Sequence, residues 1–343
     1  MRKLLNTLYV TSPDSYLALE GENIVILREE EQIFRIPLHN VEGVVAFGYT
    51  GASPALMGAC AKNNISMTFL TPSGRFLARV TGEVRGNVVL RKEQYHISED
   101  EERALAVAKN IMIGKILNSR NCIERTARDY SMRVDGDKLK AVSSKLKASI
   151  DSIQTCKTRD ELRGIEGEAA ANYFSVFDDM ILQQKEEFYF HGRNRRPPLD
   201  NVNALLSFVY TLLGQNIAAA LETVGLDPYV GVMHTDRPGR ISLALDLLEE
   251  LRAVFADRFV LSLINRKMVQ AADFMKKENG AVLMGDEARK LVLTQLQKKK
   301  QEVITHPFIG EKIEWGLIPY VQALLLARYI RGDLEEYPPF LWK

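Results

Sequence analysis

The spacing of apolar residues changes once along this chain, near residue 95, and that change limits the possible folds more than any other feature. Up to about residue 89 the apolar residues form short alternating runs such as SYLALEGENIVIL, between turn signals at residues 20–23 and 72–74. A longer apolar spacing in SPALMGACAKNN indicates a helix within this part. These patterns predict a small β-rich domain.

The rest of the chain has a helical pattern. Ser98 and Glu101 fit a capping box, and Val107 lies in the helical period that follows. The two consecutive prolines near the end of the sequence indicate an extended tail. We therefore predict an α+β protein, with a β-rich domain at residues 1–95 and a larger all-helical domain at residues 96–343.

Length and charge exclude several classes of protein. The 343 residues are enough for two domains, and 45 basic against 44 acidic residues give a formal charge of +1. No overall field therefore draws the chain to nucleic acid or lipid, so any such affinity requires local clustering. The sequence has no run of about 18 apolar residues and no uninterrupted apolar stretch of the secretory type near its start. We expect a soluble, cytoplasmic protein that does not contact membranes.

The cysteines support neither a zinc cage nor a disulfide framework. Cys60, Cys122 and Cys156 are widely spaced and form no C-x-x-C pair.

Glu166 is the first unusual acid. The segment 160–183 has the composition of a helix, and a step of about 100° per residue places Glu166 in the middle of its apolar stripe. That stripe contains Leu162, Ala169, Ala170, Tyr173, Phe177 and Met180. An unpaired buried carboxylate is costly, so Glu166 is expected to be protonated, ion-paired or bound to a metal. This helix alone leaves open a buried pair with Arg or Lys and a role in a functional site.

A second group of acids lies in the helical segment ISLALDLLEELRAVFADRF. One face carries the apolar residues Leu243, Leu247, Leu251, Val254 and Phe255, and another carries Asp246, Glu249, Glu250, Ala253 and Asp257. Taken alone, this pattern favours a solvent-exposed acidic face.

His234 adds weight to a functional interpretation, because it precedes a short loop that returns the chain to this acidic helix. One histidine nitrogen and two or three carboxylate oxygens suit Mg²⁺ or Mn²⁺ better than zinc, since no thiolate is offered. The remaining histidines have no comparable acid partner and are expected to be structural. They are His39, His96, His191 and His306.

Arginines flank these acids in the sequence, in HGRNRRPP and in the loop after His234. A metal beside arginines is what phosphodiester chemistry requires, because guanidinium groups hold the phosphates on either side of the reacting bond. The prolines after HGRNRR favour a defined loop, and no Walker-type glycine loop is present. Residues 298–300 are expected to be ordinary surface lysines. We assign phosphate contacts to Arg193, Arg196, Arg237 and Arg240.

The chain resembles the integrase/endonuclease subunit of CRISPR spacer acquisition. The resemblance lies in GRFLARVTGEVRGNVVLRKEQY, LRGIEGEAAANYF, RNRRPPLDNVNALLSFVYTLL, GLDPYVGVMH and SLALDLLEELR, which occur in the family's order and cover nearly the whole chain. The wording of GLDPYVGVMHTDRPGRISLALDLLEELR is most similar to versions that accompany type I-C systems.

This resemblance implies a β-sandwich-like N-terminal domain that forms homodimers and a helical C-terminal catalytic domain. It implies a Mg²⁺ or Mn²⁺ site formed by Glu166, His234 and Glu249, with Asp246 as an assisting acid. Glu249 is preferred to Glu250 because it lies one helical turn after Asp246.

The implied reaction is metal-assisted transesterification, in which the 3′-hydroxyl of a captured DNA fragment attacks a repeat phosphodiester in a CRISPR array. The implied partners are double-stranded DNA, a small ferredoxin-fold adaptation subunit and a nuclease subunit that trims fragments. Two alternatives stay open: a non-catalytic DNA-binding scaffold of the same fold, and a metal phosphohydrolase that acts on small nucleotides.

Overall fold

The computed structural model describes residues 5–12, 14–49, 51–82 and 88–342. Its contacts divide the chain into two compact units, each formed by more than one segment. Unit 1 comprises residues 1–85, 285–302 and 314–317, and unit 2 comprises residues 86–284, 303–313 and 318–343. The predicted domains, by contrast, are continuous segments, and their assignment to dimerisation and catalysis stays a prediction.

Unit 1 contains two four-stranded sheets. The strands of the first are β1 (Asn6–Val10), β5 (Val41–Phe47), β7 (Ser66–Leu70) and β8 (Phe76–Val80), in the order β1-β5-β7-β8. The strands of the second are β2 (Tyr16–Glu20), β3 (Asn23–Arg28), β4 (Glu31–Pro37) and β6 (Gly51–Ala52), in the order β4-β3-β2-β6. Gly21 and Gly74 have positive φ at the two expected turns, where their missing Cβ avoids a steric penalty.

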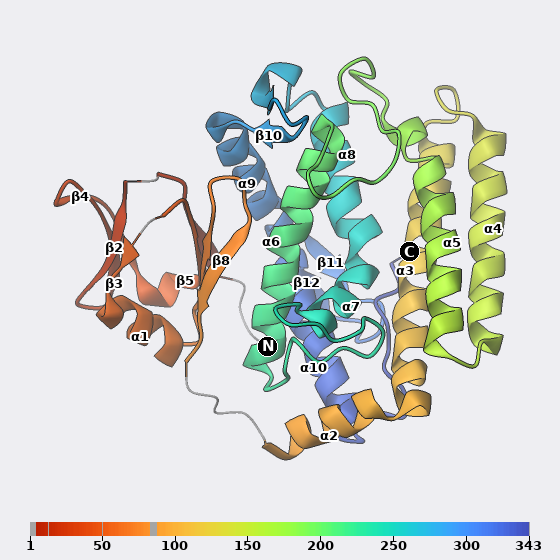
Figure 1. Ribbon diagram of the computed structural model, residues 1–343, viewed down its shortest axis with the longest axis horizontal. Helices are drawn as coiled ribbons and strands as arrows, with labels where there is room; N and C mark the ends of the chain where they lie inside the picture. The colour runs from red at the N-terminus through yellow and green to blue at the C-terminus, as the bar shows by residue number, and fades with distance from the viewer. Residues whose placement is uncertain (1–4, 13, 50, 83–87, 343) are drawn as a thin grey trace. The chain divides into compact units, whose positions relative to one another are not determined.

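One apolar core joins the two sheets. It contains Leu17 and Ile24 from the second sheet, Val44 and Met67 from the first, and Leu56 from helix α1 (Pro54–Lys62). The helix predicted in SPALMGACAKNN is thus confirmed, and the hydroxyl of its N-cap residue, Ser53, accepts a hydrogen bond from the Leu56 amide. Figure 1 shows α1 at one end of the pair of sheets.

Helix α9 (Asp286–Gln301) completes unit 1. The Lys300 ammonium, expected on the surface, is buried instead and donates hydrogen bonds to Thr7 Oγ1 and Glu42 Oε1, both at 2.9 Å. The expectation for residues 298–300 is therefore wrong at Lys300, because the ammonium pairs there with the partly buried carboxylate of Glu42 on β5.

Unit 2 is mainly helical. Its longer helices are α2 (Val88–Glu99), α3 (Glu101–Asp129), α4 (Gly136–Thr155), α5 (Arg159–Ser175), α6 (Asn201–Thr223), α7 (Ser242–Leu251), α8 (Arg258–Asn265) and α10 (Ile318–Ile330). Figure 1 shows α3, α4 and α5 side by side, in agreement with their contacts. A strand-rich region followed by a mainly helical one confirms the α+β prediction, although the region predicted to be all-helical also contains short strands between residues 274 and 314.

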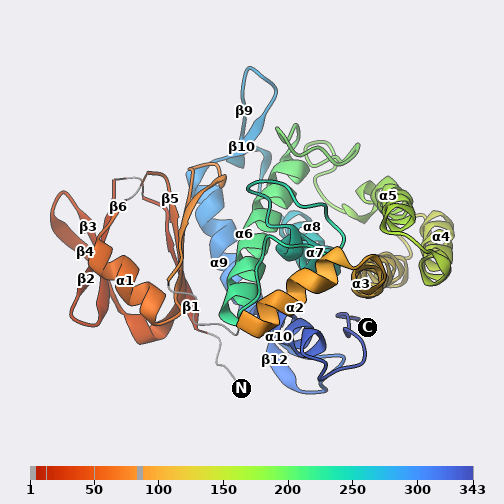
Figure 2. The ribbon, with the colours of Figure 1, turned by 60° about the horizontal axis from the view of Figure 1, so that its bottom comes forward.

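Two short two-stranded sheets and several single turns accompany these helices. Strands β9 (Phe274–Lys276) and β10 (Val282–Met284) form a hairpin that extends beyond the helices of unit 2 in Figure 2. The other sheet consists of β11 (Val303–Thr305) and β12 (Lys312–Glu314). The 3₁₀ turns are Leu38–Asn40, Asp178–Met180, Ala271–Asp273 and Trp315–Leu317.

Two helix boundaries differ from the sequence prediction. Ser98 lies inside α2, and Asp100 caps α3 by accepting hydrogen bonds from the amides of Glu102 and Arg103. An aspartate is as good an N-cap as a serine, so the capping-box signal pointed two residues too early. Helix α5 ends at Ser175, so Phe177 and Met180, counted in the stripe of Glu166, lie beyond it.

Helix α6 is long and apolar enough to cross a membrane by length and composition, but 72% of its most apolar window is buried inside the protein. Such burial is typical of the core helix of a soluble protein. Helices α7 and α8 are joined by a π-helical segment, Arg252–Asp257, so the three form one continuous helical path packed between α3 and α6.

Candidate active site

Asp246 and His234 form the first part of the site. Asp246 is fully buried on α7, and its two carboxylate oxygens accept hydrogen bonds from the amides of Val232, Met233 and His234 at 2.8–3.1 Å. The same carboxylate lies 2.5 Å from Nδ1 of His234. A Cβ on Gly231 would lie 2.9 Å from this carboxylate, so only glycine fits where the loop crosses the acid.

This arrangement fixes the orientation of the imidazole. A carboxylate accepts only, so Nδ1 carries the proton toward Asp246 and Nε2 keeps the lone pair. The side chain of His234 is 23% exposed, whereas that of Asp246 is inaccessible. Asp246 is therefore committed to the loop and the ring, and His234 is the member of the pair that can present a ligand atom.

Glu249 lies one turn further along α7 and is 5% exposed. Its Oε1 is 2.8 Å from a terminal nitrogen of Arg252, and its Oε2 is 2.9 Å from Nζ of Lys115 on α3. Burial alone would raise the pKa of Glu249, but the charges of Arg252 and Lys115 more than offset it and hold the pKa at about 2. The carboxylate is therefore ionised at neutral pH.

Lys115 also forms an ion pair with Oε1 of Glu166, which reaches it from α5. The side chain of Glu166 is 28% exposed, so it lies at the edge of the site rather than in the core. One ammonium thus stands between two carboxylates from different helices. The ion-paired alternative for Glu166 is present in this structure, with a partner that is shared with Glu249.

Glu250 faces the opposite way. Its Oε1 accepts a hydrogen bond from the Tyr337 hydroxyl at 2.8 Å, and its Oε2 accepts from Gln322 Nε2 at 2.9 Å and the Phe340 amide at 2.8 Å. Burial raises the pKa of Glu250 to about 8, despite these hydrogen bonds, which lower it. Both oxygens of Glu250 are therefore used to hold residues 337–340 against α7.

The alternative of a solvent-exposed acidic face is wrong. Asp246, Glu249, Glu250 and Asp257 are all buried, because α3, α6 and the loop before α7 cover the helix on several sides. The helical wheel identified which residues share a face, but it could not show that this face meets other elements.

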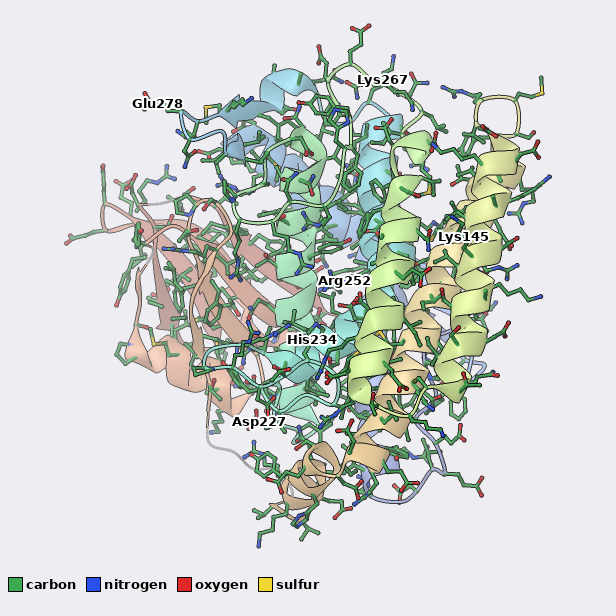
Figure 3. The ribbon with its side chains drawn as sticks, turned by 45° about the vertical axis from the view of Figure 1, so that its right-hand side comes forward. Lys145, Asp227, His234, Arg252, Lys267 and Glu278 are labelled. Carbon is green, nitrogen blue, oxygen red and sulfur yellow. The ribbon has the colours of Figure 1, made fainter. Side chains whose placement is uncertain are left out.

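A second cluster lies behind Arg252. Its guanidinium stacks over the ring of Tyr210 at 4.9 Å, and that of Arg193 lies over the same ring at 5.3 Å. The hydroxyls of Tyr210 and Tyr173 donate to the two oxygens of Asp257, whose pKa is raised to about 6 by burial. This packing fixes the arginine that contacts Glu249. Figure 3 shows His234 and Arg252 in the same region of unit 2.

The predicted phosphate contacts divide into two groups. Arg193 donates to Asn194 O, Asn203 Oδ1 and Ser207 Oγ, and burial lowers its pKa, so its guanidinium is engaged within the protein. Arg196 and Arg237 are exposed, and Arg240 is half-buried.

Arg195, which the sequence analysis did not select, belongs with the second group. The pKa of Arg240 is lowered by burial and then by the nearby positive charges of Arg237 and Arg195, and it is raised by Asp246 and Glu249. Arg240 therefore lies within electrostatic reach of Arg237 and Arg195 and of the buried acids Asp246 and Glu249.

The residues fit a divalent ion in their chemistry, although they are not assembled around one. Within the described parts of the chain, no group of three or more His, Cys, Asp or Glu side chains is close enough to hold a metal. Yet Glu166 and Glu249 already share one cation, and Oε2 of Glu249 is buried without a hydrogen bond to any described residue. Two hard oxygen donors beside an oriented imidazole match Mg²⁺ or Mn²⁺.

Sequence reasoning missed Lys115 and Arg252. Arg252 follows Glu249 by three residues on one helix, a spacing that brings side chains together and could have been used. Lys115 is 51 residues from Glu166, and no local pattern marks it.

Comparisons with known proteins agree with this fold. The family profile described as CRISPR associated protein Cas1 matches residues 8–298. A protein of Chlorobaculum tepidum named CRISPR-associated endonuclease Cas1 1 is 51% identical over 343 residues, which is the whole of both chains. A casposase bound to integration product has a TM-score of 0.85 at 22% identity, covering 99% of this chain and 95% of that one. A Cas6-RT-Cas1–Cas2 complex has a TM-score of 0.80 at 23% identity, covering 99% of this chain and 36% of that one.

Together the family profile and the named relative place the chain among enzymes of the nuclease class, as the sequence analysis expected, and the two solved structures share its fold. The chain belongs to the Cas1 family of CRISPR-associated proteins. Its assignment to type I-C stays a prediction.

Proposed function

We propose that the protein is a metal-dependent DNA integrase and endonuclease that inserts captured DNA fragments into a CRISPR array. The observation that carries this proposal is the meeting of Glu166 and Glu249 at one cation, beside a histidine that a buried aspartate orients. The Chlorobaculum relative, named as an endonuclease, and the casposase bound to its integration product support nuclease and integration chemistry.

In this proposal Glu166, Glu249 and Nε2 of His234 hold one Mg²⁺ or Mn²⁺. When bound, the ion polarises a phosphoryl oxygen and assists ionisation of the attacking hydroxyl. Asp246 keeps the His234 lone pair directed away from the loop, so the ring is a ligand without rotating. Arg252 holds the other oxygen of Glu249, which leaves Oε2 as the ligand atom.

Arg195, Arg237 and Arg240 would bind the phosphates on either side of the reacting bond, together with Arg196. A 3′-hydroxyl of the fragment then forms a new bond to phosphorus, and the bond from phosphorus to the repeat's own 3′-oxygen breaks. The attacking oxygen loses a proton and the leaving oxygen gains one, so the reaction needs no energy source.

The partners are also part of the proposal. They are double-stranded DNA, a second copy of this chain, a small ferredoxin-fold adaptation subunit and a fragment-trimming nuclease. The solved complex that contains both Cas1 and Cas2 supports a small adaptation partner.

The second candidate is a DNA-binding scaffold without catalytic activity. The ion pairs of Lys115 with Glu166 and Glu249 favour it, because acids that are already paired with a cation require no metal. Strand joining separates the two. Purified protein with Mn²⁺, a short duplex with free 3′-hydroxyls and supercoiled plasmid should give nicked and joined plasmid, and His234→Ala should give neither at an unchanged melting temperature. Equal DNA binding with no product from either protein, also after addition of the small partner, would favour the scaffold.

A further inference from the structure

Lys115 is the feature of the site that the proposed function leaves unexplained. Its ammonium contacts Oε1 of Glu166 and Oε2 of Glu249, so it lies where two of the three proposed metal ligands meet. Its side chain is only 13% exposed, so water screens these contacts poorly. A cation in this place either makes a metal unnecessary or competes with a metal for the same two carboxylates.

The contacts favour competition. Oε1 of Glu249 is held by Arg252, so Oε2 is the oxygen that is left for a metal. That oxygen is 2.9 Å from the ammonium but lacks hydrogen-bond geometry with it or with any other residue in the described ranges. It is held mainly by the charge of the ammonium, and a divalent ion offers twice the charge together with a direct bond to oxygen.

We propose that Lys115 is an internal counter-ion that occupies the proposed metal position and is displaced when a divalent ion binds. In the metal-free protein its ammonium contacts both acids and so keeps Glu166 and Glu249 together. Its flexible four-carbon stem on α3 allows the ammonium to move away without moving the helix. The inference rests on the proposed function, since it requires that these acids bind a metal.

The first test measures Mn²⁺ affinity by calorimetry, with protein freed of metal by a chelator. Lys115→Met removes the charge and keeps most of the side-chain volume. Because no ammonium has to be displaced, we expect Mn²⁺ to bind about tenfold more tightly, which is about 1.4 kcal/mol. Lys138→Met is the matched control: Lys138 pairs with Asp179 on the exposed side of α4, and its loss should leave Mn²⁺ affinity unchanged.

Thermal melting of the same proteins adds a second readout. Without metal, Lys115→Met should melt at a lower temperature than wild type, because Glu166 loses its cation. With saturating Mn²⁺ the two should melt at similar temperatures, so the metal stabilises the variant more. Equal or weaker Mn²⁺ binding by folded Lys115→Met would overturn the proposal.

The wild-type protein gives a test that does not depend on the variant's folding. Lysine acetylation followed by peptide mapping reports how accessible each ammonium is, and Lys138 serves as the internal reference. Saturating Mn²⁺ should increase acetylation of Lys115 relative to Lys138. Unchanged or decreased acetylation means that the ammonium is not displaced.

Failure of the inference and failure of the proposed function give different results. If wild-type protein binds no Mn²⁺, or if His234→Ala and Glu166→Gln bind it as well as wild type, the proposed metal site itself is wrong. If those two variants lose Mn²⁺ binding while Lys115→Met and the acetylation pattern show no change, only the role of Lys115 is refuted.

Discussion

Asp246 and Glu250 are buried acids four residues apart on α7, and conversion of each to its amide should have opposite consequences. Asp246 accepts hydrogen bonds at both oxygens from four N–H groups: three amides and the His234 ring. An asparagine amide nitrogen cannot accept, so in either orientation Asp246→Asn leaves two of these donors facing another donor.

The size of the effect follows from that count. Each unsatisfied buried donor costs about 1–3 kcal/mol, so Asp246→Asn should lower the free energy of unfolding by about 2–6 kcal/mol. At about 2 cal/mol/K of unfolding entropy per residue, each kcal/mol changes the melting temperature of this 343-residue chain by roughly 1.4 °C, so a decrease of about 3–8 °C is expected. The His234 ring also loses its acceptor, so strand joining should fall even well below the melting temperature.

Glu250→Gln is the matched comparison. A glutamine carbonyl can accept from Gln322 and the Phe340 amide, and its NH₂ can donate to the Tyr337 oxygen, so every bond is kept in number. Because the pKa of Glu250 is raised to about 8, most of the wild-type side chain is already neutral at pH 7. We expect a change within about 1 kcal/mol and retained strand joining.

Thermal melting by circular dichroism and the plasmid assay measure both properties at pH 7. If Asp246→Asn melted within about 1 °C of wild type, which corresponds to less than one unsatisfied donor, the hydrogen-bond count would be refuted. If Glu250→Gln instead abolished joining at full stability, the assignment of the ligand role to Glu249 would be wrong.

Three further expectations concern the groups around the site and unit 1. Burial raises the pKa of Asp257 to about 6, so its protonated form stabilises the fold fully below about pH 4, and this stabilisation is lost as the pH rises through 6. Asp257→Asn should therefore remove roughly 3 kcal/mol from the difference in unfolding free energy between pH 4 and pH 7. Urea unfolding at both pH values measures this difference. Arg240→Ala should weaken DNA binding at all sequences and reduce by about one the slope of the logarithm of the binding constant against the logarithm of the salt concentration. Arg193→Ala should mainly lower the melting temperature, because the guanidinium of Arg193 is engaged within the protein. Lys300→Met leaves the partly buried carboxylate of Glu42 without its cation, so chemical denaturation should show a loss of about 2–3 kcal/mol. A loss below about 1 kcal/mol would show that water replaces the ammonium.

Sequence periodicity predicted the fold class because the spacing of apolar residues depends on the local secondary structure and not on how the elements pack together. It also located His234 and Asp246 together, since a short loop has to return the chain to α7. It identified Glu166 as an anomalous acid, and its ion pair with Lys115 is one of the two outcomes left open.

Burial of whole helices was harder to predict. A wheel assumes that one face of a helix meets water, and α7 has no such face, because α3 and α6 pack on it. The role of Arg193 depends on Asn203 and Ser207, whose positions follow only from the path of the loop before α6. Lys115 reaches the site from a distant helix, and such pairs require the assembled bundle.

The three groups that hold Glu250 come from residues 72 to 90 positions later in the chain. During synthesis, α7 therefore emerges with an acid that has no partner, and stays so until residues 322–340 have left the ribosome. A chain interrupted between these points would have to bury a carboxyl group without hydrogen-bond partners beside Glu249, or leave the helix undocked. The acid next to the proposed metal ligand thus makes formation of the site conditional on synthesis of the chain as far as residue 340.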